Sequence, residues 1–200
     1  MSRQYESGTE LHQKILKGAN ILADNVASTL GPRGRNVILY HPEQNPIITK
    51  DGVTVAKFVE LEDPFENVGA QIIKQAAART NSEAGDGTTT STVLARAILA
   101  QAQRYLMAGS APIELKRGMD KAVEKIVENL KNMSTPIMSV GDIAHIATIS
   151  ANNDKLVGKL IAKGVELAGK DGAITIEEAR SIETSLDLVE GFRFDSGYLA

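Results

Sequence analysis

The sequence predicts a mainly α-helical fold, in which a multihelical domain with one small β-hairpin is followed by part of a smaller α+β segment. Apolar residues recur at steps of three and four through most of the first 135 residues, as they do on the buried face of a helix. Within that region, two short strand-like runs are joined by a polar loop that contains proline. Two further strand-like runs appear only after Pro136, which indicates a second segment of mixed character.

The first predicted helix is followed by a hairpin. The dipeptide Gly31-Pro32 is expected to end the helix, because glycine tolerates a left-handed cap and proline cannot continue a helix. Residues 36–40 and 46–50 then read as two short strands. The apolar positions that predict the helix are Leu11, Ile15, Ala19, Leu22, Val26 and Leu30.

Three long helices are predicted next. The first begins at Asp63-Pro64-Phe65-Glu66, which offers a capping aspartate and a proline at the first helical position. A break at Gly85-Asp86-Gly87 separates it from a helix over about Thr88–Met107, and the third begins near Pro112. The stripe expected to be buried on the third comprises Met119, Val123, Ile126, Leu130 and Met133.

We place a domain boundary at 134–137. Residues 1–135 then form the helical domain, residues 136–190 a smaller segment, and residues 191–200 the start of a third unit. The run from Ser139 to Asp142 resembles a capping box that opens a short helix, and Asn153-Asp154 opens another. The later strands are predicted at 173–177 and 185–189.

Composition excludes several functional classes. The formal charge is −3, from 22 basic and 25 acidic residues, which argues against nucleic acid as the main partner. No apolar run is long enough for a transmembrane helix, and the N-terminus lacks the apolar core of a secretory signal. The chain has no cysteine, which fits the cytosol. The three histidines show no metal-ligand spacing.

The most informative stretch is residues 84–92, AGDGTTTST. Two glycines bracket Asp86, and five hydroxyl residues then open an apolar helix, whose N-terminus suits phosphate oxygens. A carboxylate beside phosphates is repulsive unless a cation lies between them, so Asp86 indicates Mg²⁺. The alternative is an ordinary turn whose threonines cap the helix, and this stretch alone does not decide between the two interpretations.

Two weaker signals lie upstream. Residues 29–35, TLGPRGR, combine a helix end with glycine and positive charge, although an ordinary Gly-Pro stop explains them as well. Lys50-Asp51-Gly52 is a common turn pattern, yet Lys50 could meet phosphate and Asp51 could orient or deprotonate water. Together, the three signals predict a nucleotide- or phosphate-binding α-rich domain.

Six blocks of the chain resemble group I chaperonins, the GroEL family, in order and spacing. They are TLGPRGRNVIL at 29–39, TKDGVTVAK at 49–57, AGDGTTTSTVLAR at 84–96, ELKRGMDKAV at 114–123, ATISANND at 147–154 and EGFRFDSGYL at 190–199. The resemblance implies that residues 1–135 begin an equatorial ATP-binding domain, 136–190 an intermediate hinge domain, and 191–200 an apical domain. Chains of that family are longer, and the remainder supplies the rest of the nucleotide site.

The resemblance also implies a role for each matching residue. Asp51 would be the catalytic residue that positions the attacking water, and Asp86 would hold Mg²⁺. The residues that would contact nucleotide are Thr29, Leu30, Gly31, Pro32, Lys50, Asp86, Gly87, Thr88, Thr89, Thr90, Ile149 and Ser150.

By this resemblance, the protein is expected to be an ATP-dependent chaperone, an ATPase that encloses and folds non-native polypeptides in a ring. Its cofactors would be ATP or ADP with Mg²⁺, and K⁺ is a candidate second cation. Its partners would be unfolded polypeptide clients, copies of itself in a heptameric single or double ring, and a co-chaperonin lid, but neither nucleic acid nor membrane. The expected location is the cytoplasm of a bacterium or phage-infected host, with an organellar matrix as the alternative. The rival hypothesis is a truncated, non-catalytic chaperonin-like subunit that modulates complete rings.

Overall fold

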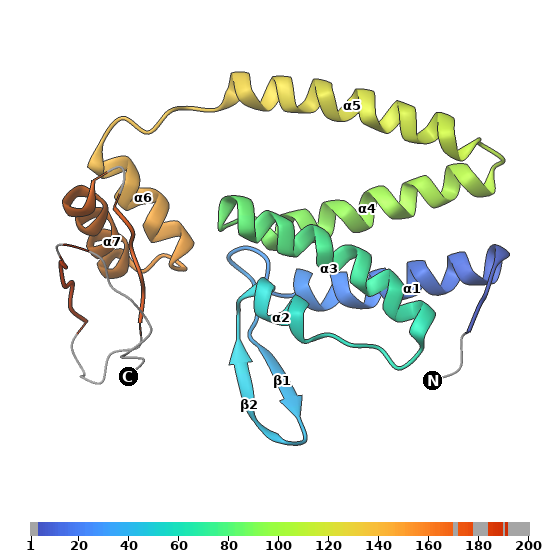
Figure 1. Cartoon of the computed structure of the whole chain (residues 1–200), viewed down its shortest axis with the longest axis horizontal. Helices are drawn as coiled ribbons and strands as arrows, with labels where there is room; N and C mark the ends of the chain where they lie inside the picture. The colour runs from blue at the N-terminus through green and yellow to red at the C-terminus, as the bar shows by residue number, and fades with distance from the viewer. Residues whose placement is uncertain (1–3, 170–171, 178–183, 190, 192–200) are drawn as a thin grey trace, which may run out of the picture. The chain divides into compact units, whose positions relative to one another are not determined.

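The computed structural model describes residues 4–169, 172–177, 184–189 and 191. The predicted third unit at 191–200 therefore lies outside the described residues, apart from Gly191. The chain divides into two compact units, residues 1–128 and 129–200, a division that falls a few residues before the boundary predicted from sequence. The mainly helical fold with one small hairpin is confirmed (Figure 1).

In the described part of the first unit, helices α1 to α4 pack together beside the hairpin, and the fifth helix begins in this unit and continues past its last residue, 128. Helices α3, α4 and α5 begin within a residue of their predicted starts. None of the helices in the described part of the chain is long and apolar enough to cross a bilayer. In chain order, the elements are α1 (Gly8–Ala27), β1 (Val37–His41), β2 (Gln44–Thr49), α2 (Gly52–Phe58), α3 (Pro64–Ala84), α4 (Thr88–Met107) and α5 (Pro112–Met133).

Helix α1 ends three residues earlier than the periodicity predicts. The N–H of Thr29 donates to Val26 O at 3.1 Å and the N–H of Leu30 donates to Ala27 O at 3.0 Å, so both bonds reach back three residues instead of four. These i→i−3 bonds replace the i→i−4 bonds of an α-helix, so the last turn predicted for the helix is a loop. Gly31 follows with a φ of 71°, a left-handed conformation that favours glycine. The stop at Gly31-Pro32 therefore belongs to the loop that follows the helix.

The hairpin pairs β1 with β2 in antiparallel register. Val37 lies opposite Thr49, and the pairing is irregular between Leu39 and His41. Leu39 is buried against the helices, whereas the tip of the hairpin is exposed. Strand β2 ends at Thr49, and the Lys50-Asp51 segment and α2 follow it directly.

Helices α1 and α3 cross at two glycines. A Cβ added to Gly18 would overlap the backbone carbonyl of Glu66, and a Cβ added to Gly69 would overlap that of Ile15. Each helix thus offers the other a side-chain-free patch, and the two backbones come into direct contact. Both helices also pack against α4, and α2 contacts all three. The core between these elements consists of Ala19, Leu22, Val26, Leu39, Val55, Ala56, Ala70, Ile73 and Ala77.

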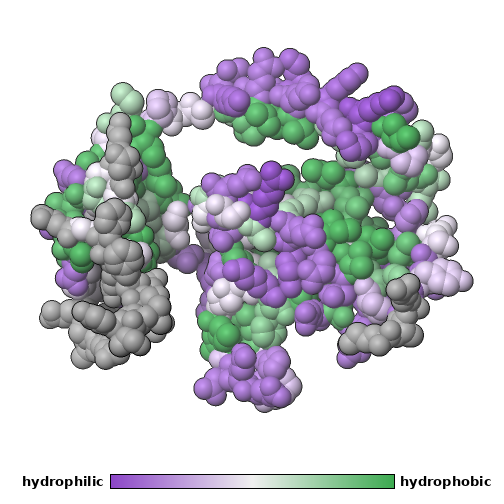
Figure 2. Space-filling model, viewed as in Figure 1, coloured by the Kyte–Doolittle hydropathy of each residue, from purple (hydrophilic) through white to green (hydrophobic). Residues whose placement is uncertain are grey.

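The apolar stripe of α5 was predicted to be buried, and this prediction is wrong. None of its described side chains is buried: Val123 and Ile126 are each 56% exposed and Met133 is 78% exposed. The stripe itself is real, since Figure 2 shows one hydrophobic and one hydrophilic side along this helix. The helix therefore forms with the predicted amphipathic pattern, but the described residues do not cover its apolar side.

The second unit contains α6 (Val140–Ser150) and α7 (Lys155–Ala168). The predicted capping box is confirmed, because the Asp142 N–H donates to Ser139 Oγ at 3.2 Å and the Ser139 N–H donates to Asp142 Oδ2 at 3.0 Å. The two helices meet closely at Gly158, where a Cβ would overlap Thr148. This contact explains why α7 has a glycine at the point where it meets α6.

The strands predicted at 173–177 and 185–189 are not found. Both segments are described, yet neither is paired with another described segment, and a strand requires that ladder of hydrogen bonds. Ile174 and Leu186 instead extend side chains toward Gly164 of α7. One apolar residue of each segment therefore packs near α7, whereas Ile176 and Leu188 are exposed.

Replacement of Gly69 by alanine is expected to destabilise the first unit by roughly 3 kcal/mol, because the added methyl group forces α1 and α3 apart. Urea denaturation followed by circular dichroism measures the loss. Gly118→Ala on α5 is the matched control, since no atom lies near the added Cβ and alanine favours helix by about 1 kcal/mol. Equal stability for the two variants would contradict the close crossing.

Candidate functional site

The segment that precedes α4 places two glycines in left-handed conformations, with φ of 71° at Gly85 and 84° at Gly87. Gly87 is the N-cap of α4, and no side chain caps the helix. Helices α2, α3, α6 and α7 differ, because each has a side-chain cap. The start of α4 therefore combines an uncapped helix N-terminus with a glycine-rich approach, as an anion site requires.

The hydroxyl residues at this N-terminus are not equivalent. Thr88 and Thr92 are buried, and the hydroxyls of Ser91 and Thr92 donate to Thr88 O at 2.9 and 2.8 Å. Thr89 is half-buried and Thr90 is exposed. Of the predicted phosphate contacts, Thr89 and Thr90 can therefore offer hydroxyls to a ligand. Thr88 is buried, and the phosphate contact expected for it stays a prediction.

Asp86 lies between the two glycines and is exposed. Its Oδ1 accepts a hydrogen bond from the Gly87 N–H at 2.6 Å, which fixes the turn that leads into α4. The carboxylate consequently lies directly before the uncapped helix end. Among the described residues, no group of three or more histidine, aspartate or glutamate side chains could hold a metal by itself. A Mg²⁺ ion at Asp86 would therefore take its other ligands from phosphate and water, a pattern that this ion favours.

The loop after α1 presents backbone more than side chains. The Thr29 side chain is buried and its hydroxyl donates to Val26 O at 2.8 Å, so it is not available to a ligand. Leu30, Gly31 and Pro32 are exposed. The Arg35 N–H donates to Ser28 O at 2.8 Å and closes the loop. Of this predicted segment, residues 30–32 are therefore the part that a nucleotide could reach.

Asp51 is the N-cap of α2, a seven-residue helix that sequence reasoning missed. Its Oδ2 accepts from the Thr54 N–H at 2.8 Å and from the Thr54 hydroxyl at 2.6 Å, and its Oδ1 accepts from the Val53 N–H at 3.3 Å. At the other end of α2, Lys74 of α3 donates to Lys57 O at 2.9 Å and Val59 O at 3.1 Å. Both ends of the short helix are thus fixed by side chains.

These hydrogen bonds also set the charge of Asp51. Partial desolvation opposes its ionisation, but the Thr54 hydroxyl, the N–H groups of Thr54 and Val53, and the nearby Lys57 charge outweigh that effect. The pKa of Asp51 is therefore held below its ordinary value of 3.8. A carboxylate of this kind stays ionised near neutral pH and is a weak proton acceptor.

Gly52 joins the Asp51 segment to α4. A Cβ added to Gly52 would overlap the Thr89 hydroxyl and would touch Val26 of α1. The main chain next to Asp51 therefore lies against the first turn of α4 and near the last turn of α1. Figure 1 shows the loop after α1, helix α2 and the start of α4 at the same end of the helical layer. Three segments that are remote in sequence meet here.

The remaining predicted site residues are Lys50, Ile149 and Ser150. Lys50 is half-buried beside Asp51. Ile149 and Ser150 end α6 in the second unit, and Ile149 is 68% exposed. The first unit thus brings together the segments around residues 30–32, 50–52 and 86–90. The assignment of Ile149 and Ser150 stays a prediction.

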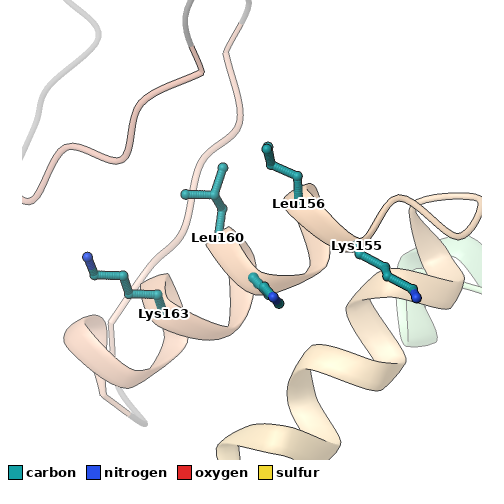
Figure 3. Close-up of a pocket in the computed structure, with 5 residues that line it drawn as sticks. Lys155, Leu156, Leu160 and Lys163 are labelled. Carbon is teal, nitrogen blue, oxygen red and sulfur yellow. The ribbon is translucent and has the colours of Figure 1, made fainter.

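A hollow of about 460 Å³ lies along α7 and contains none of the predicted site residues. Figure 3 shows that its lining side chains all come from one helix. They are Lys155, Leu156, Lys159, Leu160 and Lys163. A wall of one helix, without glycine backbone or carboxylate, lacks the groups that would hold a magnesium-bound nucleotide.

Comparison with known proteins identifies related folds. Residues 22–200 match the model of the TCP-1/cpn60 chaperonin family. A group III chaperonin in the open state superposes with a TM-score of 0.66 at 23% identity, over 79% of this chain and 32% of that one. The chaperonin gp146 from bacteriophage EL 2 (Pseudomonas aeruginosa), crystallised in the presence of ATP-BeFx, gives a TM-score of 0.64 at 28% identity, over 78% and 28% of the two chains. This chain therefore spans about a third of the length of these structures.

The low pKa of Asp51 has a consequence for stability. Because the pKa is lower in the folded than in the unfolded state, the ionised cap stabilises the protein above the ordinary value of 3.8, and this contribution disappears as the pH falls below it. Asp51→Asn is therefore expected to show a smaller loss of stability than the wild type between about pH 5 and pH 2. Urea midpoints across this range measure the difference, with the caps at Asp63 and Asp142 present in both proteins. Parallel pH profiles would refute the ionised cap.

Proposed function

This chain belongs to the TCP-1/cpn60 chaperonin family, and from that premise we propose that it is the nucleotide-binding part of an ATP-driven protein-folding machine. The observation that carries the proposal is the close approach of Gly52 to Thr89, which sets the main chain next to Asp51 against the uncapped first turn of α4. Phosphate-binding groups and a carboxylate that stays ionised thus come from separate segments to one place. The arrangement suits phosphoryl transfer to water, where positioning and charge stabilisation supply most of the catalysis.

The triphosphate would bind at the start of α4. Its oxygens would accept hydrogen bonds from the first N–H groups of the helix and from the hydroxyls of Thr89 and Thr90. The exposed backbone of residues 30–32 would line the nucleotide, and Lys50 would add a positive charge near the phosphates. Asp86 would hold Mg²⁺, which when bound neutralises charge on the phosphate oxygens. K⁺ is a further candidate ion for the same phosphates.

Asp51 would orient the attacking water. The water would donate a hydrogen bond to the carboxylate while its oxygen forms a bond to the γ-phosphorus, and the bond between that phosphorus and the β–γ bridging oxygen would break. Because the pKa of Asp51 is depressed, the proton of the water would pass to phosphate or solvent in preference to this carboxylate. The depressed pKa therefore favours orientation of water over deprotonation, the two roles that the sequence left open.

The machine would act as a ring. We infer that the native protein assembles from copies of itself, as a heptameric ring in one or two layers, and binds non-native polypeptide clients with the help of a co-chaperonin lid. Family membership supports this inference, and so does the fold shared with the group III and bacteriophage chaperonins. ATP binding would shift the domains and move a client from capture to enclosure, and the proposed location is the cytoplasm.

Asp86→Ala in the native protein is expected to abolish Mg²⁺-dependent ATP binding, because it removes the carboxylate proposed to hold the Mg²⁺ ion. Isothermal titration calorimetry with Mg-ATP measures the affinity. Asp120→Ala, on the exposed surface of α5, is the control and should bind as the wild type does. If Asp86→Ala bound Mg-ATP normally, the proposed nucleotide site would be wrong.

Asp51→Asn is expected to retain ATP binding but to lower turnover by roughly 10², because the amide lacks the charge that orients the water. Asparagine is preferred to alanine here, since its oxygen can still cap α2. Steady-state phosphate release measures kcat and KM separately. A wild-type kcat in this variant would remove Asp51 from the mechanism.

A further inference from the structure

Asp51 differs from the other aspartate caps in the described structure. Asp63 accepts from two backbone N–H groups at 2.8 and 3.2 Å and pairs through Oδ2 with Lys14 Nζ at 3.2 Å, whereas Asp154 accepts from two N–H groups at 2.9 and 3.1 Å. Asp51 accepts from two backbone N–H groups and also from the Thr54 hydroxyl, at 2.6 Å. Since α3 and α7 are capped without a hydroxyl donor, capping alone does not require this third hydrogen bond.

The two carboxylate oxygens of Asp51 have unequal surroundings. Oδ2 accepts from both the hydroxyl and the N–H of Thr54. Oδ1 accepts from the Val53 N–H at 3.3 Å, which is long for such a bond. A carboxylate oxygen offers about two acceptor positions, so Thr54 fills those of Oδ2 while Oδ1 keeps capacity for another donor.

The backbone of Asp51 is held as firmly as its side chain. The Asp51 N–H donates to Thr49 Oγ1 at 3.0 Å, and the adjacent Gly52 lies against Thr89 of α4. The residue is thus fixed on both sides along the chain, and the rotation of its carboxylate is fixed by Thr54. One oxygen is thereby selected for the bond to a ligand.

We propose that Thr54 is a positioning residue for ATP hydrolysis: its hydroxyl holds Oδ2 of Asp51, so that Oδ1 is the atom that accepts the hydrogen bond of the attacking water. This inference rests on the proposed ATPase function and adds to it a residue outside the groups that contact nucleotide. Thr54 itself touches neither phosphate nor water. It acts by fixing the orientation of the Asp51 carboxylate and by keeping that carboxylate ionised.

The kinetic test compares Thr54→Val with Thr54→Ser in the native protein. Valine keeps the shape of threonine but removes the hydroxyl, so kcat for ATP hydrolysis should fall roughly tenfold while KM for ATP stays within about twofold. Serine keeps the donor and should restore most of kcat. Thr80→Val is the matched control, because the Thr80 hydroxyl donates to Ala76 O within α3, at 3.0 Å. Wild-type kcat in Thr54→Val would overturn the proposal.

A second measurement tests the link without nucleotide. Carboxyl carbon shifts followed by nuclear magnetic resonance should show that the pKa of Asp51 rises in Thr54→Val and not in Thr54→Ser, with Asp63 as the internal reference. An unchanged Asp51 pKa in Thr54→Val would also overturn the proposal. If the wild-type protein failed to bind or hydrolyse ATP, the proposed function would fall, whereas this titration would still decide whether Thr54 controls Asp51.

Discussion

Close backbone approach at a few glycines is the constraint on which the first unit depends. At Gly18 and Gly69, α1 and α3 meet without intervening side chains, and this crossing forms the base on which α4 and α2 pack. At Gly52, the chain comes within contact of Thr89. A side chain at Gly18 or Gly69 would change the distance between α1 and α3, and one at Gly52 would displace the Thr89 hydroxyl, so the fold and the proposed site share one geometric requirement.

The charges of the proposed site follow from how each helix begins. Helix α4 begins at a glycine and leaves its positive end for a ligand, whereas α2 begins at Asp51, which the helix uses as a cap. The two helix starts meet through Gly52 and Thr89, so a partly positive N-terminus lies near a carboxylate that stays negative at neutral pH. An ion pair between Asp24 and Arg96 further ties α1 to α4.

Sequence reasoning succeeded where local chemistry decides the structure. Asp63 and Ser139 act as caps as predicted, and the glycines around Asp86 separate α3 from α4. Sequence reasoning failed where contacts between residues far apart in sequence decide the structure. Helix α2 was missed because Val53, Thr54 and Val55 are β-branched and weak helix formers, and it is held by Lys74 and by the core. The strands expected at 173–177 and 185–189 require partners that no local pattern reveals.

For the site, the residue types could be predicted, but their exposure could not. A run of threonines indicates phosphate binding, yet the burial of Thr88 and Thr92 depends on how α4 packs against its neighbours. The hydroxyl of Thr29 bonds back to its own helix, and only the structure shows this. The hydrogen bond from Thr54 to Asp51 had a sequence signal, a threonine three residues after an aspartate, but it is informative only once α2 is known.

The shortness of α2 has a consequence for temperature dependence. An isolated helix of seven residues is unstable in water, so α2 persists only through its contacts and the side chains at its two ends. Local opening of such an element requires less free energy than unfolding of the whole unit. If Asp51 acts as proposed, hydrolysis would decline on heating before the helical core melts, because the carboxylate loses its support first.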